Sequence, residues 1–213
     1  MALLSIAYFP PVEYFVLLAK YSVIELEACE NYQKQSYRNR CRIYAADGPQ
    51  ALNVPVVHEN GTFKLPITQI KVDYSTPWVT RTKRAIDAAY YSSAYFEYYR
   101  DQLYSILDSK PETLFSLDLQ LTQFLALKCG IKTDIRFTED FLPGTPGEDF
   151  REIIHPKRAN TILEDNNLKK PYFQVFSGKY GFLPNLSVID LLFNEGPDSI
   201  SYLKPQADSN NGI

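Results

Sequence analysis

The chain has 213 residues, of which 45% are hydrophobic and 22% are charged, and its net charge at pH 7 is -3. A chain of this length can form one large domain or two small ones and can bury a core without disulfide or metal staples. Domains that bind nucleic acid are usually strongly basic, so the net negative charge argues against that class of protein.

The three cysteines, Cys29, Cys41 and Cys129, are odd in number, widely spaced and free of any CxxC pair. This pattern indicates neither a zinc site nor a disulfide framework, and reduced cytoplasmic thiols are the plain interpretation. The N-terminus lacks the basic and long apolar regions of a signal peptide. No run approaches the roughly 20 apolar residues of a membrane helix. We therefore expect a cytoplasmic protein with no membrane span.

The first elements are predicted to be strand, turn and helix. Leu3–Tyr8 is a short apolar run, which favours a buried strand. Pro10 and Pro11 end this strand because proline has no N–H for the ladder, and Pro11 suits the first helical position. Four apolar residues then follow at helical spacing: Val12, Phe15, Val16 and Ala19. Val23–Glu27 is predicted to be the second strand.

The next third of the chain is predicted to be mainly β. In Arg38–Ala45, polar and apolar residues alternate, which places Arg38, Arg40 and Arg42 on one side of a strand. "ADGPQ" and "HENG" are predicted turns. Two further strands are expected, Ala51–Val57 and Ile67–Tyr74.

Helices are predicted for most of the remainder. Thr76 is the expected N-cap of a helix that reaches about Leu107, with an interruption near Ser92–Ser93. A second helix runs from Pro111 to Gly130 and carries one apolar stripe. The stripe consists of Leu114, Leu117, Leu121, Phe124 and Leu125. Asp134–Phe137 is expected to return to the sheet.

Two later helices are predicted from capping signals. Thr145 and Glu148 form a capping box, and His155–Pro156 should end that helix. Ser187 is the expected cap of the second helix, which should stop at Gly196–Pro197. Residues 206–213 are predicted to be a flexible tail.

These elements predict an α/β fold with a Rossmann-like N-terminal sheet portion and a helix-rich C-terminal portion. We expect one domain over residues 1–205, strand-rich in 1–75 and helix-rich in 76–205. The strand order does not follow from the sequence.

The proline turn "YFPPVEYF", Tyr8–Phe15, is a candidate ligand site. In open α/β sheets, ligands bind outside the carboxyl ends of the strands, where this turn would lie. Tyr8, Pro10 and Tyr14 would form a rigid wall, and Glu13 would lie in the first helical turn, where the helix dipole favours a carboxylate. The alternative is a stiff turn that is merely packed by aromatic rings.

The arginine-rich segment "ENYQKQSYRNRCRI" is a second candidate site. Arginine pairs well with carboxylates and phosphates, so three arginines on one strand face indicate an anionic ligand, with Lys34 and Asn39 as further donors. The alternative is a solvated face paired with acids such as Glu27 and Glu30.

His155 is a candidate acid or base because the pKa of histidine is near neutrality. The alternative is that it caps the last carbonyls of its helix. The signatures of serine hydrolases, phosphate-binding loops, dinucleotide-binding glycine motifs and zinc proteases are absent.

Taken together, five segments resemble the WbqC-like protein family. They are "YFPPVEYF" at Tyr8–Phe15, "ENYQKQSYRNRCRI" at Glu30–Ile43, "LNVPV" at Leu52–Val56, Trp78 in "STPWV", and "VIDLLFNEGP" at Val188–Pro197. Lys34, Asn39 and Arg40 stand as in the family motif. The chain departs from it at four places: Ser5 and Ile6 stand where the family has Gln-Pro, Glu13 stands where it has glycine, Asn31-Tyr32 replaces Gln-Tyr, and Tyr37 replaces Trp.

The resemblance implies a transferase in O-antigen or other surface-polysaccharide biosynthesis, with a glycyl group as one suggested cargo. The expected substrate is an anionic small molecule such as a nucleotide-linked or lipid-linked sugar, and no metal or other cofactor is required. Glu13, Glu30 or His155 would move the proton. The predicted substrate-binding residues are Tyr8, Pro10, Tyr14, Asn31, Tyr32, Lys34, Tyr37, Arg38, Asn39, Arg40, Arg42 and Trp78. The rival interpretation is a non-catalytic module that binds a sugar or a partner protein in the same pathway.

Overall fold

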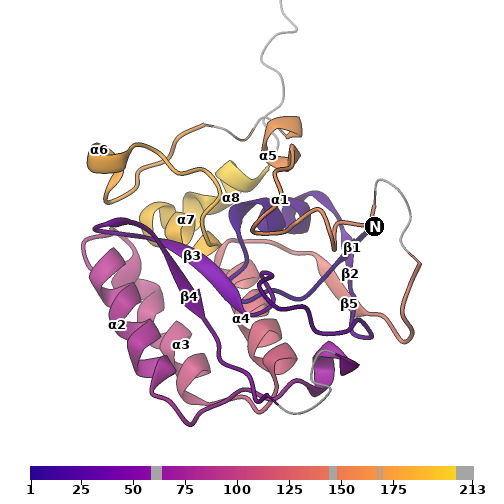
Figure 1. The fold of residues 1–213 in the computed structure, drawn as a ribbon. Helices are drawn as coiled ribbons and strands as arrows, with labels where there is room; N and C mark the ends of the chain where they lie inside the picture. Colours follow the sequence, from indigo (N-terminus) through magenta and orange to yellow (C-terminus); the bar gives the residue numbers. More distant parts are fainter. Residues whose placement is uncertain (59–63, 144–147, 167, 169, 205–213) are drawn as a thin grey trace, which may run out of the picture.

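The structure is a computed structural model that describes residues 1–58, 64–143, 148–166, 168 and 170–204 (Figure 1). Most of the predicted "HENG" turn, the Thr145 end of the capping box and the predicted tail lie outside the described residues.

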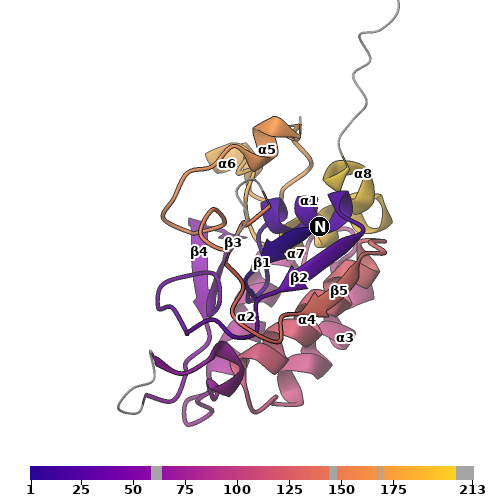
Figure 2. The same cartoon turned by 90° about the vertical axis from the view of Figure 1, so that its right-hand side faces the viewer.

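A small parallel sheet contains three strands in the order β1-β2-β5: β1 (Ala2–Leu4), β2 (Val23–Leu26) and β5 (Asp134–Phe137). Helix α1 (Val12–Lys20) connects β1 to β2, because neighbouring parallel strands need a crossover connection. Figure 2 shows the three strands side by side, with α1 next to them. The predicted strand–helix–strand start is confirmed, and so is the return of Asp134–Phe137 to the sheet.

Two antiparallel strands form a separate hairpin, β3 (Arg40–Ala45) with β4 (Gly48–Asn53). The predicted turn is confirmed at Ala46–Asp47, but Gly48–Gln50, predicted as part of it, belong to β4. The strand predicted over Ala51–Val57 therefore begins earlier and ends at Asn53. The predicted strand over Ile67–Tyr74 is wrong in its first half, which is the 3-10 helix η2 (Ile67–Gln69). The second half makes only single bridges, one from Lys71 and one from Val72.

Three long helices follow the hairpin: α2 (Trp78–Tyr90), α3 (Phe96–Asp108) and α4 (Leu114–Lys128). The gap between α2 and α3 confirms the predicted interruption near Ser92–Ser93. The expected cap by Thr76 is wrong, because α2 begins after Pro77 and no side chain caps it. Thr113 caps α4, and its hydroxyl accepts a hydrogen bond from the N–H of Ser116 at 3.2 Å.

The C-terminal part contains short helices: α5 (Ile162–Asp165), α6 (Ser177–Tyr180), α7 (Val188–Glu195), η3 (Gly196–Asp198) and α8 (Ser199–Leu203). Ser187 caps α7 as predicted. The predicted helix that ends at His155 is wrong, because residues 148–155 form turns. Arg151 organises these turns through ion pairs with Glu27 and Asp149.

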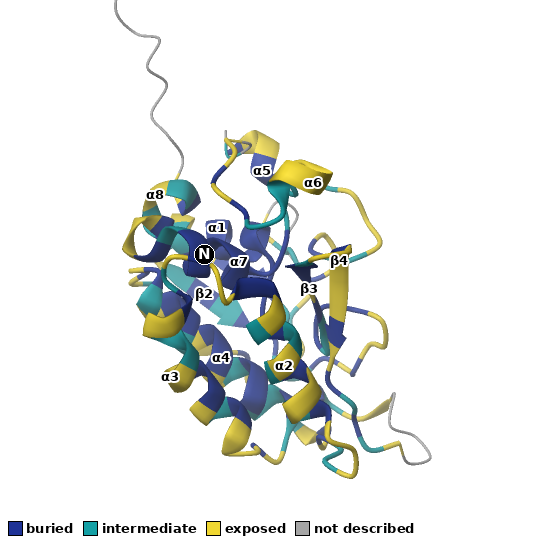
Figure 3. Cartoon of the chain, turned by 90° about the vertical axis from the view of Figure 1, so that its left-hand side faces the viewer, coloured by how far each residue is buried: buried dark blue, intermediate teal, exposed yellow. Residues whose placement is uncertain are grey.

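The buried residues of the sheet and of α1, α4 and α7 form one continuous hydrophobic cluster. Figure 3 shows buried faces turned inward on α1, α4 and α7, whereas α2, α3 and β4 carry many exposed residues. None of the helices in the described part of the chain is long and apolar enough to span a bilayer.

Gly196 offers a direct stability test of the turn after α7. Its φ is +54°, and a Cβ added there would lie 2.5 Å from the ring of Tyr95. We expect Gly196→Ala to lower the free energy of unfolding by roughly 3 kcal/mol or more, because backbone strain and a steric clash add. Gly130→Ala is the matched control: φ is +73° there too, but the nearest atom, in Ile200, is 3.9 Å away. The free energy of unfolding of both variants is measured by urea denaturation. If it falls equally in the two variants, the packing of Tyr95 against Gly196 is contradicted.

Candidate functional site

The proline turn lies directly against the arginine-bearing strand. The N–H of Tyr8 donates to the carbonyl of Tyr37 at 2.8 Å, and the N–H of Ser187 donates to the carbonyl of Arg42 at 2.8 Å. The N–H of Val188 donates to the carbonyl of Pro10, also at 2.8 Å. Three of the segments that carry the family resemblance therefore meet at one place.

The backbone is strained in the middle of this turn. Phe9 has a φ of +42°, although its side chain is bulky and fully buried. A left-handed conformation costs a non-glycine residue on the order of 1–2 kcal/mol, and such strain gathers at functional sites. The surrounding hydrogen bonds hold the turn in this conformation.

The prediction that three arginines share a strand face is wrong for Arg38. This residue precedes β3, and its side chain is buried against Glu30. Nε of Arg38 donates to Oε1 of Glu30 at 2.8 Å, and Nη2 donates to Oγ of Ser5 at 2.7 Å. The alternative interpretation, an arginine paired with a nearby acid, therefore holds here. Arg38 and Glu30 each have their charge neutralised by the other.

Arg40 and Arg42 do project from the same side of β3, two residues apart. Neither forms an ion pair with another residue of the described chain. Arg42 is exposed and Arg40 is partly buried. Two guanidinium groups are thus left for an anion, rather than three.

The charges of Glu13 and Arg42 both act on Tyr37. Burial raises the pKa of Tyr37, the negative charge of Glu13 raises it further, and the positive charge of Arg42 lowers it. Glu13 is 2% exposed, and its Oε2 accepts a hydrogen bond from the amide of Asn160 at 2.9 Å. Burial raises the pKa of Glu13, which the amides of Asn160 and Asn185 oppose. A buried carboxyl group with a raised pKa and an arginine without an ion pair to the described residues therefore both act on Tyr37.

His155 does not cap a helix, because no helix ends there. Its Nδ1 accepts a hydrogen bond from the N–H of Lys157 at 3.2 Å. Burial lowers the pKa of His155, and the charge of Arg158 lowers it further. The imidazole is therefore mainly neutral near pH 7.

A pocket of about 340 Å³ opens at the carboxyl end of the parallel sheet. We call it the carboxyl-edge pocket. Its lining residues are Glu30, Asn31, Tyr32, Gln33, Phe141, Asp149, Arg151 and Glu152. Three of them, Glu30, Asn31 and Tyr32, belong to the predicted site. The location agrees with the rule that open α/β sheets bind ligands beyond the ends of their strands.

Buried ion pairs connect the segments that follow the strands at the carboxyl end of the sheet. Glu27 follows β2, and its Oε1 accepts a hydrogen bond from the hydroxyl of Thr138 at 2.6 Å, just after β5. Nη1 of Arg151 donates to Oε2 of Glu27 at 2.8 Å, and the guanidinium lies 4.8 Å from the ring centre of Phe141. The positive charge of Arg151 is thus neutralised, so the edge itself provides no uncompensated cation for a phosphate.

Sequence reasoning missed Asp118, on the inner side of α4. Its side chain is fully buried, and neither carboxylate oxygen has a hydrogen-bond partner among the described residues. The hydroxyl of Thr122, one turn further along α4, is also buried without a partner in the described chain. Burial raises the pKa of Asp118 well above its ordinary value.

Four predicted site residues share this property. The Tyr8 hydroxyl, Oδ1 of Asn39, Nε of Arg40 and Nε1 of Trp78 are buried and unpaired with respect to the described residues. We call these residues, with Asp118 and Thr122, the unpaired cluster. Each buried polar atom without a partner costs roughly 1–3 kcal/mol, and a native protein contains few of them. Ser93, Arg100 and Asn194 have such atoms too, so the property is not confined to the motif. The four motif positions are the ones that we take as candidate ligand contacts.

Electrostatic coupling links two members of the unpaired cluster, Tyr8 and Asp118. Burial raises the pKa of Tyr8, and the nearby Cys41 thiol and Asp118 carboxyl raise it further. Thr82 lies beside the Tyr8 hydroxyl and lowers this pKa, although the two side chains do not reach hydrogen-bonding geometry. Trp78 stacks on Tyr74 with ring centres 5.8 Å apart.

Tyr32 connects the unpaired cluster to the carboxyl-edge pocket. It lines the pocket, yet it is only 4% exposed. Burial raises the pKa of Tyr32, which Arg40 lowers and Asp118 raises. One side chain therefore borders the pocket on one side and lies near Asp118 and Arg40 on the other.

The remaining predicted residues fall into two groups. Tyr14 and Pro10 are buried, and the Tyr14 hydroxyl donates to the carbonyl of Ser5 at 3.0 Å, so these residues shape the turn. Asn31 and Lys34 are exposed. The amide of Asn39 donates to the carbonyl of Val54 at 3.2 Å, which orients its unpaired oxygen.

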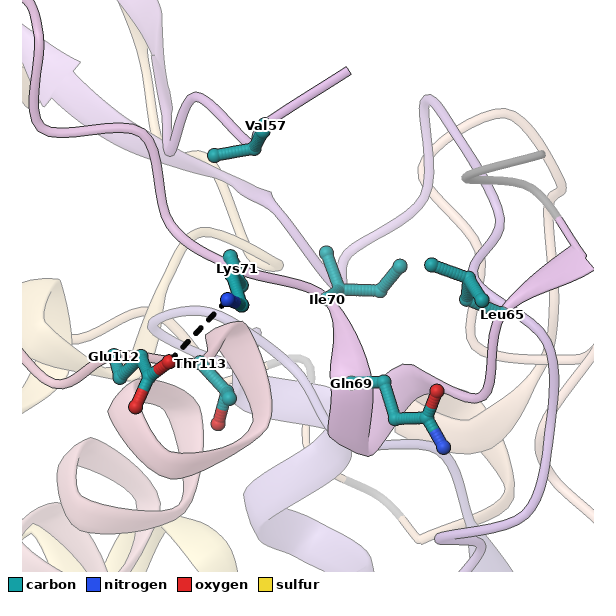
Figure 4. A pocket seen from close by; sticks show the side chains of 7 residues that line it. All are labelled: Val57, Leu65, Gln69, Ile70, Lys71, Glu112 and Thr113. Carbon is teal, nitrogen blue, oxygen red and sulfur yellow. Dashed lines mark ion pairs between the residues drawn. The ribbon is translucent and has the colours of Figure 1, made fainter. Parts of the chain in front are cut away.

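A larger pocket, of about 420 Å³, lies between η2 and the start of α4 (Figure 4). Lys71 points toward Glu112, with which it forms an ion pair of 3.6 Å. The other lining residues are Val57, Leu65, Gln69, Ile70 and Thr113. None of them belongs to the predicted site. Within the described ranges, no three acidic, histidine or cysteine side chains are grouped so that they could hold a metal ion.

Comparison with known proteins agrees with this placement of the motifs. The WbqC-like protein family matches residues 7–167, which include the proline turn, β3, Trp78 and Asp118. The chain belongs to the WbqC-like protein family. It is 25% identical, over 226 aligned positions, to an uncharacterised protein of Mycobacterium tuberculosis, with coverage of 96% of this chain and 97% of that protein. No solved structure matches the chain.

The burial of Asp118 predicts a pH-dependent stability difference. Because the pKa of Asp118 is raised on folding, the folded protein keeps a proton that the unfolded chain releases, so stability falls as pH rises through this interval. Asp118→Asn lacks this proton. We expect its free energy of unfolding, relative to wild type, to increase with pH above about 4, by up to about 1.4 kcal/mol per pH unit. Urea denaturation between pH 4 and pH 8 measures the difference.

The matched control is Asp140→Asn, which changes an exposed carboxyl group. Its stability curve should run parallel to that of wild type. If the Asp118→Asn curve did so too, Asp118 would not be a buried protonated acid.

Proposed function

We propose that this WbqC-like protein is a cytoplasmic transferase of surface-polysaccharide assembly that modifies a nucleotide-linked or lipid-linked sugar. The observation that carries the proposal is the coincidence of motif residues with unsatisfied buried polar atoms in the unpaired cluster. A purely structural segment would pair such atoms, whereas a ligand site leaves them for the ligand.

Arg40 and Arg42 are the residues proposed to hold the phosphate of the donor. They project from one side of β3 and have no ion pair with the described residues. Arginine donates two parallel hydrogen bonds to a phosphate, which fixes its orientation as well as its charge. Arg38 is not part of this anion site because Glu30 neutralises it.

Glu13 is the favoured base among the three predicted proton-moving residues. In the proposed reaction, an amine or hydroxyl of the acceptor attacks the acyl or phosphoryl group of the donor, and Glu13 accepts the proton as the new bond forms. The bond between that group and the donor's thiol, alcohol or phosphate breaks, and this leaving group departs with the electron pair. Its raised pKa and its electrostatic coupling to Tyr37, on which Arg42 also acts, suit this role. Glu30 already binds Arg38 and Ser5, which leaves it less able to change its protonation state. The amino-acyl cargo, glycine included, is part of the same proposal and rests on the family resemblance.

The rival function is a binding module without turnover. It shares the arginine pair and the unpaired cluster but needs no base at Glu13. Binding and product formation must therefore be measured separately.

Titration with a panel of nucleotide-sugars tests the anion site. We expect at least one to raise the melting temperature of wild type, and Arg40→Ala or Arg42→Ala to weaken its binding roughly tenfold to a hundredfold, the usual value of a charge-assisted contact. Arg84→Ala, which removes an exposed arginine on α2, should bind as wild type does. If no nucleotide-sugar binds, or if all three variants bind equally well, this anion site is wrong.

Glu13→Gln separates a transferase from a binding module. With a nucleotide-sugar that binds as the acceptor, and with an activated aminoacyl donor such as a glycyl thioester, whose thiol is the leaving group, mass spectrometry should detect an acylated sugar for wild type. The variant should bind as tightly but form product at least about a hundredfold more slowly, because a general base is lost. Binding without any product from wild type would favour the binding module.

A further inference from the structure

The carboxyl-edge pocket contains acidic side chains whose charges are already compensated. Each of its three carboxylates forms an ion pair with an arginine. The pairs are Glu30 with Arg38, Asp149 with Arg151, and Glu152 with Arg158. These compensated charges make a cation a poor ligand for the pocket. Because the same ion pairs occupy the arginines, a phosphate would meet no uncompensated cation among the lining residues, all of which are described.

The lining residues are nevertheless suited to a neutral polar ligand. An ionised carboxylate has about four lone-pair sites, so a paired one can still accept further hydrogen bonds. Nε2 of Gln33 donates to Oε1 of Glu152 at 2.9 Å, which places an amide and a carboxylate side by side in the pocket. The side chain of Asn31 is exposed and forms no hydrogen bond within the described part of the chain. The pocket therefore offers donors and acceptors whose charges are balanced, and a hydroxyl group matches both kinds.

Phe141 adds an apolar ring to this polar pocket, and it is 61% exposed. The guanidinium of Arg151 lies 4.8 Å from the centre of the ring, and ion pairs with Glu27 and Asp149 hold that guanidinium in place. Arg151 therefore supports the ring from one face, whereas the high exposure leaves another part of the ring accessible to a ligand. The face of an aromatic ring is electron-rich, so it attracts weakly positive C–H groups.

We propose that the carboxyl-edge pocket binds one uncharged sugar ring, whose C–H groups pack on Phe141 and whose hydroxyls form hydrogen bonds with Asn31, Gln33 and Glu152. Its volume of about 340 Å³ lies within the usual range of small-molecule sites, roughly 300–1,000 Å³. This inference deepens the proposed function and rests on it only for the sugar being the modified substrate. The choice of a neutral ligand with hydroxyl groups follows from the lining of the pocket.

The larger pocket between η2 and α4 lacks this combination. None of its described lining residues is aromatic, and its charged side chains, Lys71 and Glu112, are paired with each other. Since the two pockets are of similar size, the larger one serves as an internal control for where a sugar binds.

The test titrates ¹⁵N-labelled protein with uncharged methyl glycosides of hexoses, deoxyhexoses and N-acetylhexosamines. Because these probes carry no phosphate, they bypass Arg40 and Arg42. We expect at least one glycoside to shift the backbone amide signals of the carboxyl-edge pocket in a saturable way and to leave those of the larger pocket unchanged. The proposal is overturned if no glycoside shifts the signals of the carboxyl-edge pocket, or if the signals of the larger pocket respond instead.

Variants of Phe141 and Asn31 test the two kinds of contact. Phe141→Leu, which removes the ring but keeps an apolar side chain, should weaken binding at least about fivefold, whereas Phe141→Tyr should bind within about twofold of wild type. Asn31→Ala should weaken binding roughly threefold to tenfold, the value of one or two neutral hydrogen bonds.

Phe173→Leu is the matched control, because Phe173 is 63% exposed and does not line the pocket. It should bind the glycoside as wild type does. Both phenylalanines are largely exposed, so both variants should melt close to wild type. Equal affinity of wild type, Phe141→Leu and Asn31→Ala for the glycoside overturns the sugar site.

The outcomes also separate this inference from the proposed function. If nucleotide-sugars bind through Arg40 and are modified while Phe141→Leu and Asn31→Ala behave as wild type, the sugar site is wrong and the transferase stands. If glycosides bind at Phe141 but no nucleotide-linked or lipid-linked sugar is modified, the sugar site stands and the transferase is wrong.

Discussion

The rest of the site depends on one backbone constraint, the inability of Pro10 and Pro11 to continue a strand. The chain therefore leaves the parallel sheet soon after Leu4 and turns into α1. Backbone groups that a longer strand would have paired within the sheet pair instead with Tyr37, Leu186 and Val188. These hydrogen bonds bring together the N-terminal turn, the start of β3 and the start of α7, which are far apart in the sequence. The strained Phe9 is the local cost of this arrangement.

Around this turn, buried charged side chains occur in two contrasting environments. Glu27, Glu30, Arg38 and Arg151 are buried in complementary ion pairs, which hold the carboxyl edge of the sheet together. Breaking such a pair leaves a buried charge without compensation, so these residues are structural supports. Asp118 has no such partner in the described chain, and nearby polar atoms are unpaired as well. The paired residues therefore stabilise the site, whereas the unpaired polar atoms are available to contact a ligand.

Much of the fold could be predicted from local patterns. The proline signal, the periodicity of the helices and the caps at Ser187 and Gly196 act over a few residues, so they are visible in the sequence. The predicted helix before His155 failed because Arg151 forms a long-range ion pair with Glu27 and a second, local ion pair with Asp149, and these contacts override the local capping signal. Likewise, the alternating sequence pattern predicts that Arg38 belongs to the strand with Arg40 and Arg42. Instead, Arg38 precedes β3, and its side chain forms a buried contact with Glu30.

The site was predicted only in part for the same reason. Motif residues Tyr8, Asn39, Arg40 and Trp78 were identified, but their common feature, unpaired buried atoms, depends on packing between distant segments. Asp118 did carry a local signal that was overlooked. It occupies a position of the apolar stripe of α4, four residues after Leu114 and three before Leu121, where a carboxyl group is out of place.

The most direct test of this account is the protonation state of Asp118. In protein labelled with ¹³C at the aspartate carboxyl carbon, NMR can follow each carboxyl group as pH is raised. The account predicts a signal that remains protonated after the exposed aspartates have ionised, and this signal should be missing from Asp118→Asn. If Asp118 ionises together with the exposed aspartates, it is not a buried neutral acid, and the account of the unpaired carboxyl group in the core would be contradicted.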